Sequence, residues 1–417
     1  MNIGIVTTWF ERGAAYVSKQ YYNTLKLKHD VFIYARGGEK YAENDINWNI
    51  SSVTWGKKTF IQLPLAIDYQ DFIKWIKKNR IEIVFFNEQQ MWDPVLWCHS
   101  LGLKTGCYID YYTEETIPFF SIYDFLICNT KRHYEVFKWH KQCYFIPWGT
   151  DISLFAPKNF DLVNEQVVTF FHSCGMSPDR KGTDLILRVF SKLNEEAKLI
   201  IHSQQNLKTF FPNLKEVIES LQKKGILTLI EKEIPAPGLY SLGDVYLYPS
   251  RLDGIGLTIT EALAVGLPVI TSDNAPMNEI INEKNGKLVK INKFWARFDG
   301  YYWPQCEVDL DDLECKIRFY INNKNKIKQY KIFAREYSEK FLDWTKNKNN
   351  IFYIFERSNI LDYKNKKNII KSIKIFEKNR SNYIIKLFKI KLFNNFPELY
   401  CLLKSFSNII INKNRTF

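Results

Sequence analysis

Short apolar runs alternate with helix-like stretches along most of the chain, and this alternation limits the fold more than any other feature. Runs of this kind separated by helices are typical of parallel strands covered on both faces. The alternation stops near residue 151 and resumes at residue 167, which indicates two similarly built α/β domains. The expected strands of the first series are 2–6, 30–37, 81–86, 105–110, 124–129 and 144–151. Those of the second series are 167–173, 198–203, 226–231, 244–250, 268–273 and 285–291.

The length of 417 residues favours two domains and an appendage over one core. We predict an N-terminal Rossmann-like domain at 1–157, a C-terminal one at 165–335, a helix at 336–360 that returns towards the first domain, and a basic tail at 363–417. Neither domain carries the Gly-x-Gly-x-x-Gly fingerprint, which argues against a nicotinamide or flavin dehydrogenase. Ligands bind at the carboxyl ends of parallel strands, so we expect a cleft between the domains.

Positive charge is concentrated at the C-terminus. Residues 363–417 hold eleven lysines and two arginines against two glutamates, a net +11 of the chain's +13. The sequence leaves two interpretations of this tail open: a disordered Lys/Asn-rich segment with weak helices, or a peripheral anchor on anionic lipid, with each lysine contributing about 1 kcal/mol. Nucleic-acid binding is not expected, because the basic residues form no recognised module.

No apolar run reaches the roughly 20 residues of a membrane-spanning helix, and the opening MNIGIVTTWF lacks the basic lead-in of a signal peptide. We therefore expect a cytoplasmic protein, which the anchor interpretation of the tail would place at the inner face of the membrane. The eight cysteines include no Cys-x-x-Cys pair and are expected to be buried free thiols. Asp309–Asp312 (DLDD) is expected to begin a helix rather than bind a metal, so we predict no metal and no cofactor.

The stretch at 250–270, SRLDGIGLTITEALAVGLPVI, carries the clearest candidate site. It follows an expected strand, and we predict a loop to Gly256, a helix from 257 or 258 to about 265, and a stop at Gly266. A helix amino end attracts anions, and the loop glycines allow close backbone approach to a ligand. Asp253 and Glu261 add two acceptors for the hydroxyls of a polyol. An ordinary turn followed by a helix with a solvated glutamate would have the same sequence.

The run at 244–270 resembles the donor-binding signature of the family-4 (group 1) retaining glycosyltransferases, with an aspartate where the first acid is usually glutamate. Segments at 146–157, 170–187 and 277–289 resemble further family motifs in the same order, and the resemblance covers roughly residues 1–358. It implies the GT-B fold, two Rossmann-like domains facing a cleft, with the acceptor mostly on the first domain and the nucleotide sugar mostly on the second.

The resemblance also implies roles for individual residues. Glu261 would hold the ribose hydroxyls and Asp253 the donor sugar, and Lys181 would bind the diphosphate. Met176 stands where the family has an arginine, and the adjacent Arg180 is expected to replace it. Backbone amides would line the sugar and phosphates at Gly254, Ile255, Gly256, Leu257 and Thr258.

In the first domain, Arg12 and Gly13 fall in the family's phosphate-side loop after the first strand. Asp110 occupies the place of a histidine that many relatives have near the reacting sugar, with Glu114 behind it, and an aspartate that caps the next element is the other interpretation. We assign Asp110, Lys181 and Glu261 as the catalytic set. Glu88 and Trp92, after another strand, are predicted to face the acceptor together with Asp110 and Glu114.

The implied function is that of a retaining glycosyltransferase, a hexosyltransferase or a related enzyme. It would move a sugar from a nucleotide diphosphate donor to a glycan or lipid-linked acceptor in cell-surface polysaccharide or glycoconjugate synthesis. A GT-B nucleotide-sugar 2-epimerase is the neighbouring alternative. A non-catalytic sugar-nucleotide-binding scaffold at the membrane is another, because the histidine and the arginine are missing.

Overall fold

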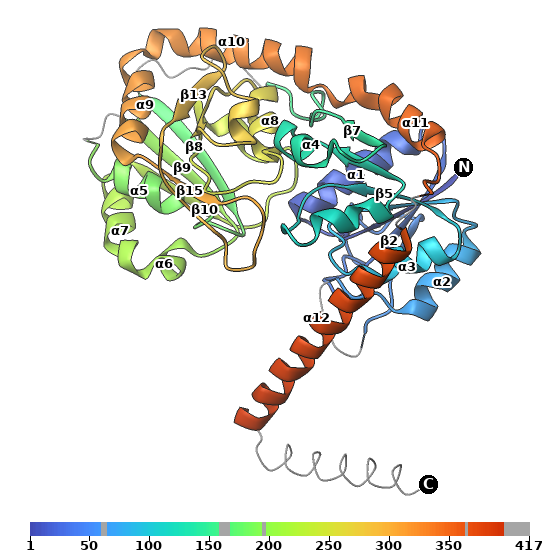
Figure 1. The fold of residues 1–417 in the computed structure, drawn as a ribbon. Helices are drawn as coiled ribbons and strands as arrows, with labels where there is room; N and C mark the ends of the chain where they lie inside the picture. The colour runs from blue at the N-terminus through green and yellow to red at the C-terminus, as the bar shows by residue number, and fades with distance from the viewer. Residues whose placement is uncertain (60–64, 158–166, 194–196, 363–365, 396–417) are drawn as a thin grey trace, which may run out of the picture.

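The computed structural model describes residues 1–59, 65–157, 167–193, 197–362 and 366–395, with side chains described up to Ser381. The chain forms two α/β domains side by side, and a long C-terminal helix projects from the first (Figure 1). Residues 158–166, between the two series of expected strands, lie outside the described residues, as do residues 396–417 of the tail.

The N-terminal domain is built on a seven-stranded sheet in which every pair is parallel. The strand order is β3-β2-β1-β4-β5-β6-β7, so the order reverses between β1 and β4. Its strands are β1 (Asn2–Thr7), β2 (Asp30–Ala35), β3 (Val53–Trp55), β4 (Ile83–Phe86), β5 (Lys104–Tyr108), β6 (Phe125–Cys128) and β7 (Cys143–Phe145).

Alternate residues of these strands pack into two apolar layers, as expected for strands covered on both faces. Ile3 and Ile5 of β1 pack with one set of helices, whereas Val6 packs with the other. The helices of this domain are α1 (Gly13–Leu25), α2 (Tyr69–Lys78), α3 (Asp93–Ser100), α4 (Lys131–Phe137) and the 3₁₀ helix η1 (Ile117–Ile122).

The C-terminal domain repeats the same parallel plan with six strands, in the order β10-β9-β8-β11-β12-β13. The order reverses between β8 and β11. Its strands are β8 (Val168–Gly175), β9 (Ala197–Ser203), β10 (Leu227–Glu231), β11 (Val245–Tyr248), β12 (Val269–Ser272) and β13 (Gly286–Val289). Its α-helices are α5 (Thr183–Phe190), α6 (Leu207–Phe210), α7 (Lys215–Lys223), α8 (Leu257–Ala264), α9 (Leu310–Asn322) and α10 (Ile327–Tyr337), with the 3₁₀ helices η2 (Pro212–Leu214), η3 (Tyr240–Leu242), η4 (Met277–Glu279) and η5 (Lys324–Lys326).

After α10 the chain returns to the first domain. It passes through the π-helical turn η6 (Ser338–Leu342) and the 3₁₀ turn η7 (Trp344–Asn347) into α11 (Lys348–Arg357). Ile351 and Phe355 of α11 are fully buried in the N-terminal core beside α1, so the second half of the predicted returning segment is part of that core.

A hairpin that the sequence did not predict connects the two domains. Strands β14 (Ile291–Trp295) and β15 (Gln305–Val308) pair antiparallel, and their connection extends to the N-terminal domain. The rings of Tyr111 and Tyr301 stack with centroids 5.1 Å apart. The Tyr301 hydroxyl donates to the backbone oxygen of Asp110 at 3.1 Å. The hairpin therefore ties the second domain to the loop that follows β5.

The basic tail begins with one long helix, α12 (Lys366–Asn395). Ile373 is fully buried in the N-terminal core, and the backbone N–H of Trp92 donates to Glu377 at 2.9 Å. The Arg380 guanidinium donates to the Gln90 backbone oxygen at 2.7 Å. The first turns of α12 are thus docked on the domain. Within the described residues, no helix is both long and apolar enough to span a membrane.

Candidate active site

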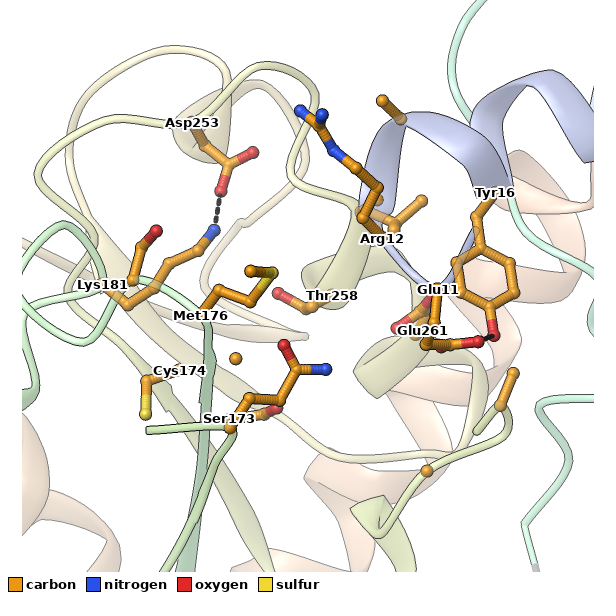
Figure 2. A pocket seen from close by; sticks show the side chains of 18 of the residues that line it. Glu11, Arg12, Tyr16, Ser173, Cys174, Met176, Lys181, Asp253, Thr258 and Glu261 are labelled. Atoms are coloured by element: carbon orange, nitrogen blue, oxygen red, sulfur yellow. Dashed lines mark hydrogen bonds and ion pairs between the residues drawn. The ribbon is translucent and has the colours of Figure 1, made fainter. Parts of the chain in front are cut away.

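The two points where the strand order reverses face each other across a cleft of about 640 Å³. In open parallel sheets, the loops that follow the strands at such a point form the usual ligand crevice. Glu11 and Glu88 reach the cleft from the loops after β1 and β4, and Met176 and Asp253 reach it from the loops after β8 and β11. Figure 2 shows side chains of both domains converging on this space.

Helices α1 and α8 both begin at the cleft. Gly13 opens α1, and a Cβ atom at that position would lie 3.9 Å from the Leu257 side chain, which opens α8. The first turn of neither helix contains an acidic residue. Because helix amino ends carry partial positive charge and free N–H groups, the middle of the cleft favours an anion.

An ion pair between Lys181 and Asp253 lies on the C-terminal wall, with Nζ and Oδ2 2.5 Å apart (Figure 2). The hydroxyl of Tyr248 contacts both groups. Burial lowers the pKa of Lys181 to about 8, while Asp253 opposes that shift. Burial alone would raise the pKa of Asp253, but Lys181 and Arg180 hold it well below its ordinary value. Both groups are therefore ionised at neutral pH.

The backbone fixes the position of these charges. Gly182 has φ +71°, and a Cβ there would lie 2.2 Å from the Pro249 backbone oxygen, so the turn that presents Lys181 requires glycine. The second Asp253 oxygen accepts the backbone N–H of Gly256 at 3.1 Å. The guanidinium of Arg180 donates to the Leu252 backbone oxygen at 3.1 Å and also lines the cleft.

Glu261 lies at the other end of the cleft, on the second turn of α8. Its Oε2 accepts the Tyr240 hydroxyl at 2.5 Å. Burial raises the pKa of Glu261 to about 7, with a further upward contribution from Glu11 across the cleft, and the Tyr240 hydrogen bond opposes the rise. This carboxyl group is thus balanced between its two protonation states near neutral pH.

The N-terminal wall is rich in acids. Glu88, at φ +52°, pairs with the Arg12 guanidinium at 3.1 Å. Such a backbone conformation is uncommon outside glycine and, in an ordered loop, often marks a functional position. Burial, and after it the charge of Glu88, raises the pKa of Asp110 well above its ordinary value. Asp110 therefore presents a neutral carboxyl group over a wider pH range than a surface aspartate.

Most of the predicted site residues share this cleft, but three do not line it. The large side chain of Trp92 is buried, with its ring packed on Phe119 and Phe120, because α12 and η1 cover it. Glu114 is exposed outside the cleft. Gly256 lies behind the lining, at φ +72°, as the N-cap of α8. The predicted residues that do line the cleft are Arg12, Gly13, Glu88, Asp110, Arg180, Lys181, Asp253, Gly254, Ile255, Leu257, Thr258 and Glu261.

Sequence reasoning missed a group of tyrosines and one acid. Tyr16, Tyr240 and Tyr248 line the cleft and hydrogen-bond its carboxylates, and Glu11 lies opposite Glu261. In the loop that holds Glu11, the sequence analysis singled out only Arg12 and Gly13. The tyrosine contacts depend on how separate elements pack, which no local pattern encodes.

The DLDD stretch begins a helix as predicted, since the Asp309 side chain caps α9 by accepting the Asp312 backbone N–H at 2.9 Å. In the described part of the chain, no three His, Cys, Asp or Glu side chains gather as a candidate metal site.

Comparisons with known proteins give the class to which this domain arrangement belongs. Residues 166–298 match the family model described as Glycosyl transferases group 1. An uncharacterized glycosyltransferase of Sulfolobus islandicus rod-shaped virus 1 is 28% identical over 141 residues, which cover 32% of this chain and 41% of that protein. The O-antigen biosynthesis glycosyltransferase WclY of Escherichia coli is 27% identical over 126 residues, covering 30% of this chain and 34% of WclY.

Among solved structures, Anabaena HepE in complex with UDP and glucose superposes with a TM-score of 0.66 at 13% identity, covering 85% of this chain and 99% of HepE. The chain therefore has the GT-B fold, as predicted. The C-terminal domain carries the group 1 glycosyltransferase match, which confirms that part of the resemblance. The sequence alignments span less than half the length of the curated relatives named above.

Proposed function

We propose that the protein is a retaining glycosyltransferase. It would transfer a sugar from a nucleotide diphosphate donor to a hydroxyl group of a glycan or a lipid-linked acceptor, in the synthesis of a cell-surface polysaccharide or glycoconjugate. The observation that carries the proposal is the anion-favouring centre of the cleft, with Lys181 and the amino ends of α1 and α8 beside it. Lys181 and α8 lie inside the region that matches the group 1 model, at residues 166–298. HepE, with the same fold, is described in complex with UDP and glucose.

In the proposed reaction, the bond between the anomeric carbon and the diphosphate oxygen breaks, and a bond to the acceptor oxygen forms on the same face. The acceptor proton passes to the departing diphosphate, so the transfer needs no enzymic nucleophile and no metal. Lys181 and the α8 amino end would stabilise the charge that develops on the leaving group. Asp253 and the neutral form of Asp110 would hold hydroxyls of the donor sugar.

Replacing Glu261 tests the donor assignment directly. We expect Glu261→Ala to abolish binding of nucleotide sugars, measured by calorimetry or thermal shift against UDP-, GDP- and ADP-sugars. A ligand at 100 times its dissociation constant raises stability by about 2.7 kcal/mol, which a thermal shift detects readily. Glu216→Ala, at an exposed position on α7, is the matched control. Unchanged donor affinity in Glu261→Ala would contradict the assignment.

Incubation with a donor and no acceptor separates transfer from the epimerase alternative. A transferase releases the free nucleoside diphosphate slowly by hydrolysis, whereas an epimerase yields a new sugar nucleotide. The absence of binding to every nucleotide sugar in the panel would favour a scaffold instead.

We also propose that the enzyme works in the cytoplasm against an anionic membrane surface, through α12. Four exposed lysines, Lys367, Lys371, Lys374 and Lys378, recur every three or four residues and so lie along one face of the helix. The opposite face is docked on the domain through Ile373. A row of lysines beside the exposed Ile375 complements anionic headgroups above an apolar layer.

The test uses charge reversal instead of truncation, because removing α12 would uncover the N-terminal core. We expect Lys→Glu at the four positions to weaken binding to phosphatidylglycerol vesicles, measured by sedimentation, by roughly three orders of magnitude. A variant with Lys→Glu at the exposed Lys192, Lys215, Lys223 and Lys224 of the C-terminal domain carries the same change in net charge. Equal loss in both variants, or no loss in the α12 variant, would contradict a specific role for α12.

A further inference from the structure

Two glutamates from opposite domains face each other at one end of the cleft. Glu11 comes from the loop between β1 and α1, and Glu261 from α8. Both line the cleft, and the charge of Glu11 raises the pKa of Glu261, so the two carboxyl groups interact across the domain boundary. Figure 2 shows them together, away from the Lys181–Asp253 pair.

Each glutamate is held by a tyrosine of its own domain. The Tyr16 hydroxyl donates to both Glu11 oxygens, at 2.7 and 2.9 Å. The Tyr16 ring is fixed in turn by edge-on packing against Trp48, with centroids 5.3 Å apart. On the other side, Tyr240 donates to Glu261 and packs against Phe171 in the core. Both carboxyl groups therefore have defined positions in the cleft.

Among the residues that the structure describes, neither Glu11 nor Glu261 forms an ion pair, in contrast to Asp253 with Lys181. Two like carboxylates that interact across the cleft repel each other, which is costly where burial reduces screening. A carboxylate only accepts hydrogen bonds. The arrangement is therefore satisfied by a neutral group that donates two hydrogen bonds in different directions, and a vicinal diol has that chemistry.

We propose that Glu11 is a second ribose-binding residue, which accepts a hydrogen bond from one hydroxyl of the nucleotide while Glu261 accepts one from the other. This inference rests on the proposed function, in which Glu261 already binds the ribose. It assigns to the N-terminal domain a specificity-determining contact with the nucleotide, and it makes the ribose diol the link between the two domains.

Deoxynucleotides test the assignment hydroxyl by hydroxyl. UDP, GDP and ADP are first compared by calorimetry, and the tightest binder is then measured with its 2′-deoxy and 3′-deoxy forms. Because a hydrogen bond to a charged group contributes about 1.5–3 kcal/mol, each deoxy form should bind wild-type protein about 10- to 100-fold more weakly. In Glu11→Ala, one of the two deoxy forms should bind about as tightly as the ribonucleotide. The other deoxy form should still bind more weakly, as it does to wild-type protein. Tyr16→Phe should partly reduce the loss of affinity for the same deoxy form, because Tyr16 holds Glu11 in position.

Glu115→Ala, an exposed acid in the same domain, is the control and should keep both penalties. Both penalties unchanged in Glu11→Ala would overturn the inference while leaving the proposed function intact, provided that wild-type protein binds the nucleotide and Glu261→Ala abolishes that binding. If no nucleotide binds wild-type protein at all, the proposed function fails and the inference fails with it. Circular dichroism of each variant separates loss of contact from loss of fold.

Discussion

The two ends of the cleft hold carboxyl groups in opposite electrostatic states. At one end Asp253 is paired with Lys181, and its pKa is lowered despite burial. At the other end Glu261 has a tyrosine and a second glutamate for neighbours, and burial raises its pKa to about 7. Burial acts in the same direction at both ends, so the nearby cation decides the outcome. One end is prepared for an anion, and the other for a neutral donor of hydrogen bonds.

The largest effect should follow from removing the cation that distinguishes the first end. Lys181→Met should lower kcat/KM by two to three orders of magnitude, roughly, because the leaving diphosphate loses its counter-charge. It should also cost about 3–5 kcal/mol of stability, since Asp253 would remain buried and unpaired. Steady-state kinetics and urea unfolding measure the two effects.

A double variant separates the effect on activity from the effect on stability. Lys181→Met combined with Asp253→Asn removes both charges, so most of the lost stability should return while the activity stays low. If the double variant were as unstable as the single one, the ion pair would not explain the stability of that end.

Substitutions of Asp110 test whether an acid without a paired cation contributes to catalysis in its neutral form. Asp110→Asn keeps the size and hydrogen-bonding capacity of a neutral carboxyl group, so we expect kcat/KM to fall about tenfold or less. Asp110→Ala should lose about 100-fold, because the hydrogen bond disappears. If Asp110 acted as an ionised base, the asparagine variant would instead lose as much as the alanine variant, and more than 100-fold.

The pH dependence of stability sharpens the comparison at the Glu261 end. Between its ordinary pKa of 4.5 and its folded pKa of about 7, the folded state holds a proton that the unfolded state has lost. Stability from this group is therefore present at low pH and is lost as the pH rises through that window. Glu261→Gln should remove the loss and stabilise the ligand-free protein at pH 8 by up to about 3 kcal/mol.

Thermal melts of wild-type and Glu261→Gln protein from pH 4 to 8 measure this effect. The two curves should converge near pH 4.5 and separate above it. Curves that stay parallel over the whole range would show that Glu261 titrates normally. The same variant should bind nucleotide poorly, so stability and function change in opposite directions.

The smallest effect is expected from the hairpin contact. Tyr301→Phe removes the hydrogen bond to the Asp110 backbone while keeping the ring stacked on Tyr111, and should cost about 1 kcal/mol of stability. Tyr302→Phe, at a partly exposed position in the same connection, serves as the comparison and should change stability by less. Equal effects would mean that the Asp110 contact is not special.

The sequence pointed to Lys181 and Asp253 at the first end of the cleft and to Glu261 at the second, but not to Glu11, for a physical reason. Asp253 and Glu261 lie within one strand-loop-helix unit, and Lys181 lies in another, so local patterns and the family resemblance found them. Glu11 lies opposite Glu261 only because the loop after β1 and helix α8, about 250 residues apart in the chain, meet across the cleft. The central strands were predicted because they are short apolar runs, whereas β3 has only three residues and no such run.

Trp92 shows a different limit. It follows a strand, as acceptor-side residues do, but whether such a residue faces the cleft or the core depends on what covers it. The sequence of α12, rich in lysine and asparagine, gave no indication that its apolar positions would pack against Phe119 and Ile122 and enclose Trp92. The hairpin of β14 and β15 was missed because its strands are antiparallel and lie outside the β/α alternation.

The hairpin has a consequence for how the domains can turn. It holds the loop around Asp110 to the C-terminal domain through Tyr301, and on the same side Glu279 accepts the backbone N–H groups of Lys131 and Arg132 at the start of α4. A rotation that separates the domains with these contacts intact must have its axis near them. Points near the axis move little, so in such a rotation Asp110 should keep its place relative to the hairpin.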